Sequence, residues 1–148
     1  MVARGTKLKR PSVASSKSKP PDSPTLFLDR SLGRNVIAAA LRQAGATVEI
    51  HDDHFPIDAK DEQWISVVGR KGWVVLTKDR RIRYRRHEQV AVKKAMACIF
   101  TLTAGDLQGE EMARIFVDAL PKMIRFVAKH NPPFIATVAK SGAISKIM

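Results

Sequence analysis

Two aspartates follow apolar segments that are typical of buried β-strands. Asp29 comes directly after Leu26-Phe27-Leu28, and Asp79 comes two residues after the Trp-Val-Val-Leu-Thr run at 73–77. Strands that alternate with helices form parallel sheets, in which the carboxyl ends of the strands lie at one edge. We therefore expect both carboxylates to project from the same edge of a sheet.

A third carboxylate, that of Asp61, stands at the expected start of the helix between these two strands. The helix dipole favours an acid at this position. Mg²⁺ and Mn²⁺ prefer carboxylate oxygens, and phosphodiester hydrolysis needs such a cation to orient water and neutralise charge. Aspartate also caps helices well, so each acid alone is weak evidence. Together, Asp29, Asp61 and Asp79 predict a catalytic centre that binds Mg²⁺ or Mn²⁺.

Basic side chains crowd around Asp79. They are Lys78, Arg80, Arg81, Arg83, Arg85 and Arg86. The whole chain has 26 Lys and Arg against 14 Asp and Glu, a net charge of +12. Such a positive field attracts polyanions, arginine can bridge two phosphate oxygens, and Tyr84 could stack on an unpaired base. We expect this basic segment to bind RNA, with a merely solvated basic face as the alternative.

The loop His51-Asp52-Asp53-His54-Phe55 could also be taken for a metal site, because it holds two imidazoles and two carboxylates. Adjacent loop residues cannot all face one ion, however, and the chain has no partner His or Cys motif for zinc. We instead expect Asp52 and Asp53, together with Thr77, to support the metal ligands or to contact the substrate.

The elements that must position these residues follow from the apolar pattern. Ser31 is a candidate N-cap for the first helix, and Gly45 is placed to end it. The expected strands lie at about 26–28, 46–50, 73–77 and 97–102, and the expected helices at about 31–45, 61–68, 87–94 and 110–127. This alternation predicts an α/β fold, a three-layer α/β/α sandwich around a mostly parallel sheet.

The composition indicates three parts. Residues 1–24 are rich in Lys, Ser and Pro, which predicts a flexible basic N-terminal arm. Residues 25–130 form the expected domain, and 131–148 are expected to be an extension, an arm or strand packed on that domain. No apolar run approaches the roughly 20 residues that span a bilayer, and no secretory leader is evident. With a single cysteine, Cys98, the chain is expected to be cytoplasmic and not membrane-bound.

Four segments together resemble a known family. They read Leu-Phe-Leu-Asp-Arg-Ser-Leu-Gly from residue 26, His-Asp-Asp-His-Phe from 51, Asp-Glu-Gln-Trp-Ile from 61, and Gly-Trp-Val-Val-Leu-Thr-Lys-Asp-Arg-Arg-Ile-Arg from 72. They are similar to the PIN-like domain of VapC-type toxin ribonucleases, and the similarity covers residues 25–104. The resemblance implies that three or four acids bind Mg²⁺ or Mn²⁺ at the edge of a parallel sheet and that the enzyme is an endoribonuclease.

The resemblance also bears on individual acids. Asp29 and Asp79 match the family's acids at strand ends, and Asp61 matches the acid on a helix, with Glu62 as its neighbouring alternative. Many members have a further acid after the next strand, for which Asp106 is the only candidate here. These residues complete the expected metal site.

The resemblance further implies a toxin with RNA as substrate and a cognate antitoxin protein that blocks the site, and a homodimer is a further expectation. The main alternative is a non-catalytic nucleic-acid-binding module with the same fold. A receiver domain fits poorly, because receivers have two adjacent acids after the first strand and only Asp29 is present here. A haloacid-dehalogenase-type phosphatase needs a second aspartate where Ser31 stands.

Overall fold

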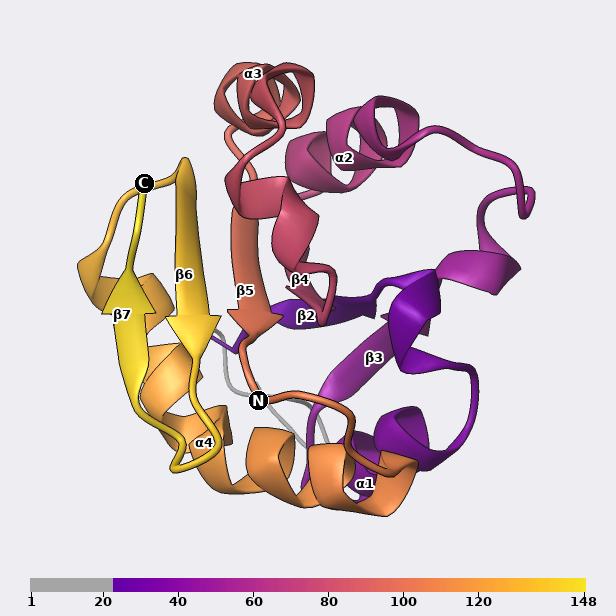
Figure 1. Ribbon diagram of the computed structural model, residues 1–148, viewed down its shortest axis with the longest axis vertical. Coiled ribbons are helices and arrows are strands. Elements are labelled where there is room, and N and C mark those ends of the chain that lie inside the picture. The colour runs from indigo at the N-terminus through magenta and orange to yellow at the C-terminus, as the bar shows by residue number, and fades with distance from the viewer. Residues whose placement is uncertain (1–22) are drawn as a thin grey trace, which may run out of the picture.

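The computed structural model describes residues 23–148, so nearly all of the arm predicted at 1–24 lies outside the described residues. Its centre is a six-stranded sheet with the order β3-β2-β4-β5-β6-β7 (Figure 1). The neighbouring strands pair in parallel from β3 to β6, and β7 pairs with β6 antiparallel. The strands are β2 (Thr25–Leu28), β3 (Thr47–Ile50), β4 (Val74–Thr77), β5 (Cys98–Leu102), β6 (Phe134–Val138) and β7 (Ile144–Lys146).

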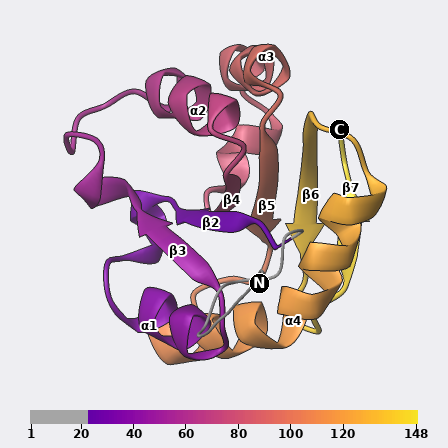
Figure 2. The same cartoon turned by 180° about the vertical axis from the view of Figure 1, so that it is seen from behind.

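Two pairs of helices cover the two faces of this sheet (Figures 1 and 2). They are α1 (Val36–Gln43) with α4 (Gly109–Lys129), and α2 (Asp61–Arg70) with α3 (Arg86–Ala95). The apolar side chains accordingly form two separate clusters, one under each pair, because strand residues point alternately to the two faces. The predicted three-layer α/β/α sandwich with a mostly parallel sheet is confirmed.

The C-terminal segment is part of the same sheet. We expected residues 131–148 to be an arm or strand packed on the core. The structure instead places β6 between β5 and β7, with Ile135 opposite Ile99 and every residue of β6 buried. The apolar sequence Phe-Ile-Ala-Thr-Val suits a strand that is covered on both faces. The sheet therefore continues past residue 130, the boundary that the composition suggested.

The start of the first helix differs from the prediction. Ser31 does not cap it; it lies in the short 3-10 helix η1 (Arg30–Leu32), which Asp29 caps. Gly33 then adopts a φ of +76°, a left-handed conformation that ends η1, and α1 begins only at Val36. The Ser31 hydroxyl donates a hydrogen bond to the Asp29 carboxylate and is not used for capping. Gly45, with a φ of +99°, follows the end of α1 as expected.

The strand order reverses at β2. From β2 the chain first forms β3 on one side and then crosses to β4 on the other. Ligands of open α/β sheets bind at the carboxyl ends of the strands at such a reversal. Leu28 pairs with Leu76 here, and the Asp29 N–H donates a hydrogen bond to the Leu76 carbonyl over 3.0 Å. The segments that carry Asp29 and Asp79 therefore leave the sheet side by side.

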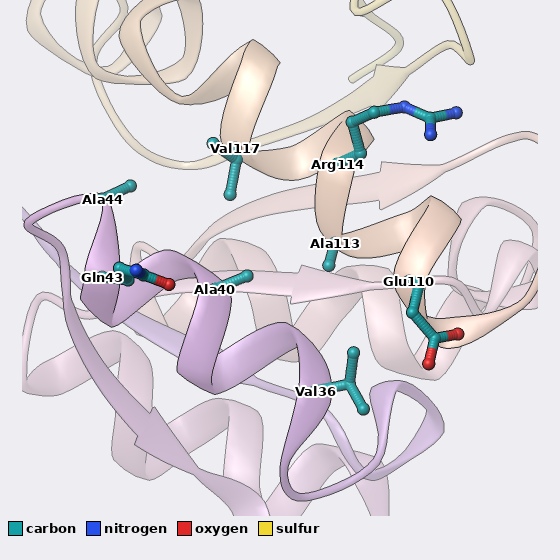
Figure 3. A pocket seen from close by; sticks show the side chains of 8 residues that line it. All are labelled: Val36, Ala40, Gln43, Ala44, Glu110, Ala113, Arg114 and Val117. Atoms are coloured by element: carbon teal, nitrogen blue, oxygen red, sulfur yellow. The ribbon is translucent and has the colours of Figure 1, made fainter.

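The helical layer formed by α1 and α4 contains a groove. Helices α1 and α4 leave a hollow of about 500 Å³ between them, with Val36, Ala40, Ala113 and Val117 among its walls (Figure 3). Among residues 23–148, no helix combines the length and the apolar character that crossing a membrane requires.

Helices α2 and α3 approach most closely where Gly69 faces Ala95. A Cβ at residue 69 would lie 2.5 Å from the Ala95 Cβ and 2.7 Å from its carbonyl oxygen. We predict that Gly69→Ala lowers the free energy of unfolding by about 1–3 kcal/mol, as overpacking does, although alanine is the better helix former. Urea denaturation measures this, with Gly105→Ala as the control because nothing lies within 4 Å of a Cβ there. Unchanged stability of Gly69→Ala would show that the two helices separate easily.

Candidate functional site

Asp29 is held in place by three hydrogen bonds to its carboxylate. The Arg30 N–H donates to Oδ1 over 2.7 Å, while the hydroxyls of Ser31 and Thr77 donate to Oδ2 over 2.8 and 2.7 Å. The residue is buried, with 9% of its surface exposed. Because charge-assisted hydrogen bonds compensate the loss of water, this carboxylate can remain in a fixed orientation at the end of β2.

Asp79 is tied to the same hydroxyl. Its backbone N–H donates to Thr77 Oγ1 over 3.0 Å, so the Thr77 hydroxyl accepts from Asp79 while donating to Asp29. The side chain of Asp79 caps the 3-10 helix η3 (Arg80–Arg83) by accepting a hydrogen bond from the Arg81 N–H. Thr77, which we predicted to support the ligands, thus connects the two strand-end acids.

The Arg81 guanidinium pairs with Asp79. Its Nε lies 3.0 Å from Oδ1 and its Nη2 lies 3.3 Å from Oδ2. Burial alone would raise the pKa of Asp79, but the hydrogen bonds and positive charge of Arg81 outweigh it and lower that pKa. Asp79 therefore stays ionised, as a metal ligand must.

Asp61 is the first residue of α2, and its Oδ1 accepts a hydrogen bond from the Trp64 indole Nε1 over 3.0 Å. Trp64 is almost fully buried against Phe27 of β2, with ring centroids 5.5 Å apart. The Asp61 carboxylate is therefore held by the Trp64 side chain, which is itself anchored in the core.

The three aspartates line one cleft of about 210 Å³. Its other walls are Arg30, Ser31, His51, Ala59, Trp64 and Arg81. Within residues 23–148, however, no three Asp, Glu, His or Cys side chains are close enough to form a preassembled metal site. The three acids that the sequence singled out therefore line one cleft, but within the described residues they are too far apart to form a metal site as they stand. One of them, Asp79, is paired with the Arg81 guanidinium.

The donor set suits Mg²⁺ or Mn²⁺. Three carboxylates supply hard oxygen ligands, and the Asp29 carboxylate is held by short hydrogen bonds, as ligating carboxylates commonly are. Asp29, Asp61 and Asp79 are the residues that would hold the cation. Arg81 is mostly exposed, at 67% of its side chain, so it can move away from Asp79 without disturbing the core.

The other predicted acids lie elsewhere. Glu62 lines two neighbouring hollows but not this cleft. Asp106 is exposed, between β5 and α4, and also does not line it. Asp52 Oδ2 lies 3.7 Å from Arg34 Nε, and Asp52 Oδ1 lies 3.6 Å from His51 Nδ1. Asp53 is exposed. A ligand role for these acids stays a prediction.

The basic segment divides in a similar way. Lys78 and Arg86 are exposed: Lys78 adjoins Asp79 in the chain, and Arg86 lines a hollow with Glu62. Arg81 pairs with Asp79, and Arg85 Nη1 lies 3.2 Å from the Glu88 carboxylate, so both are already engaged within the protein. The side chains of Arg80 and Arg83, in η3, lie outside the described part of the chain.

Two residues near the site were not among the site residues predicted from the sequence, and one of them, His51, was considered only as part of the loop at 51–55. His51 is buried, lines the cleft and packs against Phe27 and Trp64, whereas His54 contacts Glu49 and Trp73. The two histidine side chains of the loop therefore have different surroundings, and His51 is the one that lines the cleft. Glu88, at 2% exposure on the first turn of α3, is the other residue. Nothing distinguished it from an ordinary first-turn acid, which the helix dipole favours on any helix.

Comparison with known proteins identifies the family of the chain. The family described as "PIN like domain" matches residues 24–104. Among curated proteins, the chain is 30% identical over 120 residues to "Putative ribonuclease VapC45" of Mycobacterium tuberculosis, covering 78% of this chain and 86% of that protein. No solved structure matches significantly. The chain therefore belongs to the family of PIN-like domains and is a relative of its VapC-type members.

Proposed function

We propose that this protein is an Mg²⁺- or Mn²⁺-dependent endoribonuclease and the toxin of a toxin–antitoxin pair. The observation that carries the proposal is the convergence of Asp29, Asp61 and Asp79 on one cleft at the reversal point of the sheet. The name of the mycobacterial relative, a ribonuclease, supports RNA as the substrate.

The chemistry divides between the cation and the side chains. When bound, the cation would orient a water molecule and neutralise charge at the phosphodiester. Asp29, Asp61 and Asp79 would hold the cation; the hydroxyls of Ser31 and Thr77 fix the orientation of the Asp29 carboxylate, and the Trp64 indole holds that of Asp61. Arg81, once released from Asp79, is placed to contact a phosphate oxygen at the mouth of the cleft.

Two exposed basic residues, Lys78 and Arg86, form what we call the rim, and they would bind the RNA backbone outside the cleft. Lys78 directly precedes Asp79, and Arg86 lines a hollow with Glu62, the neighbour of Asp61, so both are exposed cations close in the chain to residues near the acids. Phosphate contacts of this kind are independent of sequence and give affinity that decreases with salt. We therefore propose that Lys78 and Arg86 bind the RNA backbone.

The first prediction of this proposal concerns the acids. Asp61→Asn and Asp79→Asn should each abolish Mn²⁺-dependent cleavage of a mixed RNA pool, because each removes a charged ligand. Asp106→Asn and Glu62→Gln should retain activity, since neither acid lines the cleft. End mapping of the products with and without Mn²⁺ measures this. If folded Asp79→Asn protein cuts as wild type does, the proposed centre is wrong, whereas RNA binding by a wild-type chain that never cuts would favour the non-catalytic module.

A second prediction concerns the rim. Reversing Lys78 and Arg86 to Glu should reduce the slope of log affinity against log salt by about 1.4, at roughly 0.7 per lost contact with single-stranded RNA. Binding should be measured without metal, so that no cleavage occurs. The matched control reverses Arg125 and Lys129, two exposed cations on α4 in the opposite helical layer. Equal slopes for the two double variants would remove Lys78 and Arg86 from the interface.

A third prediction concerns the partner, because an unrestrained ribonuclease damages the RNA of its host. Expression of the wild-type chain alone should arrest bacterial growth, and Asp79→Asn should remove the arrest. Co-expression of the protein encoded by the neighbouring gene should restore growth, by covering the cleft or placing a cation among its carboxylates. Harmless expression of soluble chain with measurable activity on RNA in the lysate would contradict the toxin role and leave the nuclease role standing.

A further inference from the structure

Glu88 is a buried carboxylate with one unsatisfied oxygen. Only 2% of its surface is exposed. Oε2 lies 3.2 Å from Arg85 Nη1 and 3.7 Å from His87 Nε2, but Oε1 has no hydrogen-bond partner among the side chains that the structure describes. A buried carboxylate oxygen without a donor costs free energy, so its retention at this place calls for a partner from outside the chain.

Asp61 is an acidic neighbour of Glu88. The two side chains are within hydrogen-bonding reach of each other, although both are acceptors when ionised. Burial and then the charge of Asp61 raise the pKa of Glu88, against the effect of Arg85. The Arg81 guanidinium also acts on both acids electrostatically, but its hydrogen bonds go to Asp79. Among the described side chains, Arg85 is the cation that pairs with Glu88, but it bonds only to Oε2 and leaves Oε1 without a partner.

Asp61 also joins two hollows. It lines the cleft of Asp29 and Asp79, and it also lines a neighbouring hollow of about 530 Å³. The charged side chains around that hollow are the acids Asp58, Glu62 and Glu88 and the cations Arg30, Lys60 and Arg85. The first turns of α2 and α3 meet at this hollow, because Asp61 and Glu62 of α2 and His87 and Glu88 of α3 line it together. A cation beside Asp61 is consequently within reach of Glu88 from the second hollow.

We propose that Glu88 is a further metal ligand, and that Asp61 and Glu88 together hold a divalent cation through Glu88 Oε1. This inference rests on the proposed function, because it takes Asp61 to belong to the metal centre. The cation would supply the positive charge that Oε1 lacks and would remove the repulsion between the two acids.

The test is Mn²⁺ binding by the full chain, without RNA. Isothermal titration and the quenching of Trp64 fluorescence by Mn²⁺ both report it, in a Trp73→Phe background so that Trp64 is the only indole. Glu88→Gln should weaken Mn²⁺ binding by at least about tenfold, since even residues that only support ligands contribute tenfold or more. Glu110→Gln, which also changes a first-turn glutamate but lies on α4 in the opposite helical layer, is the matched control and should bind as wild type.

Two further arms keep the outcomes distinct. Glu88→Asp retains the charge but withdraws the carboxylate by one methylene, so it should also lose affinity, and it serves if Glu88→Gln does not fold. Wild-type affinity in both Glu88 variants, with weakened binding in Asp79→Asn, would show that Glu88 only pairs with Arg85 and would overturn the inference while sparing the proposed centre. Absence of Mn²⁺ binding by the wild-type chain would overturn both.

Discussion

The Thr77 hydroxyl forms the hydrogen bonds on which the arrangement of the acids depends. It donates to the Asp29 carboxylate and accepts from the Asp79 N–H, and so it connects the ends of β2 and β4 directly. A hydroxyl suits this position because it is donor and acceptor at once. Thr77 is itself 1% exposed at the end of a fully buried strand, so water cannot replace either bond. The register of Leu28 opposite Leu76 is what places this hydroxyl between the two acids.

Carboxylates that converge on one cleft repel one another, and the fold offsets this repulsion locally. Asp79 is balanced by Arg81, and Glu88 by Arg85, in both cases from the same segment of chain. Asp29 is balanced differently, by neutral donors that compensate its burial. Arg81 and Arg85, which the sequence predicted to bind RNA, are thus paired with acidic side chains of the protein itself. Since Arg81 is largely exposed, its pairing with Asp79 can be exchanged for pairing with a phosphate at little cost.

Most of this fold and the place of three acids could be predicted from the sequence, because local patterns determine them. Apolar strands that end in Asp29 and Asp79 predict acids at one edge, and the alternation with helices predicts the layers. Glu88 could not be found in this way, because its burial arises from the packing of α2 on α3, far along the chain. Residues 134–138 were underestimated for a similar reason: a short apolar segment does not reveal whether its strand enters the sheet interior or lies on its surface. Ser31 was misassigned as a cap because its hydroxyl is used by Asp29.

The side of the sheet covered by α2 and α3, where Asp61 lies, holds one of the two groups of aromatic ring contacts. Phe27 contacts His51, Phe55, Trp64 and Trp73, so one strand residue holds the loop after β3 and the helix that begins at Asp61. Aromatic contacts of this kind add to the hydrophobic stabilisation of their burial. They anchor both the histidine and the aspartate of the cleft on a rigid base at the point where like charges would drive the segments apart. The acids can lie close together here because the ring contacts of Phe27 hold the segments that carry them.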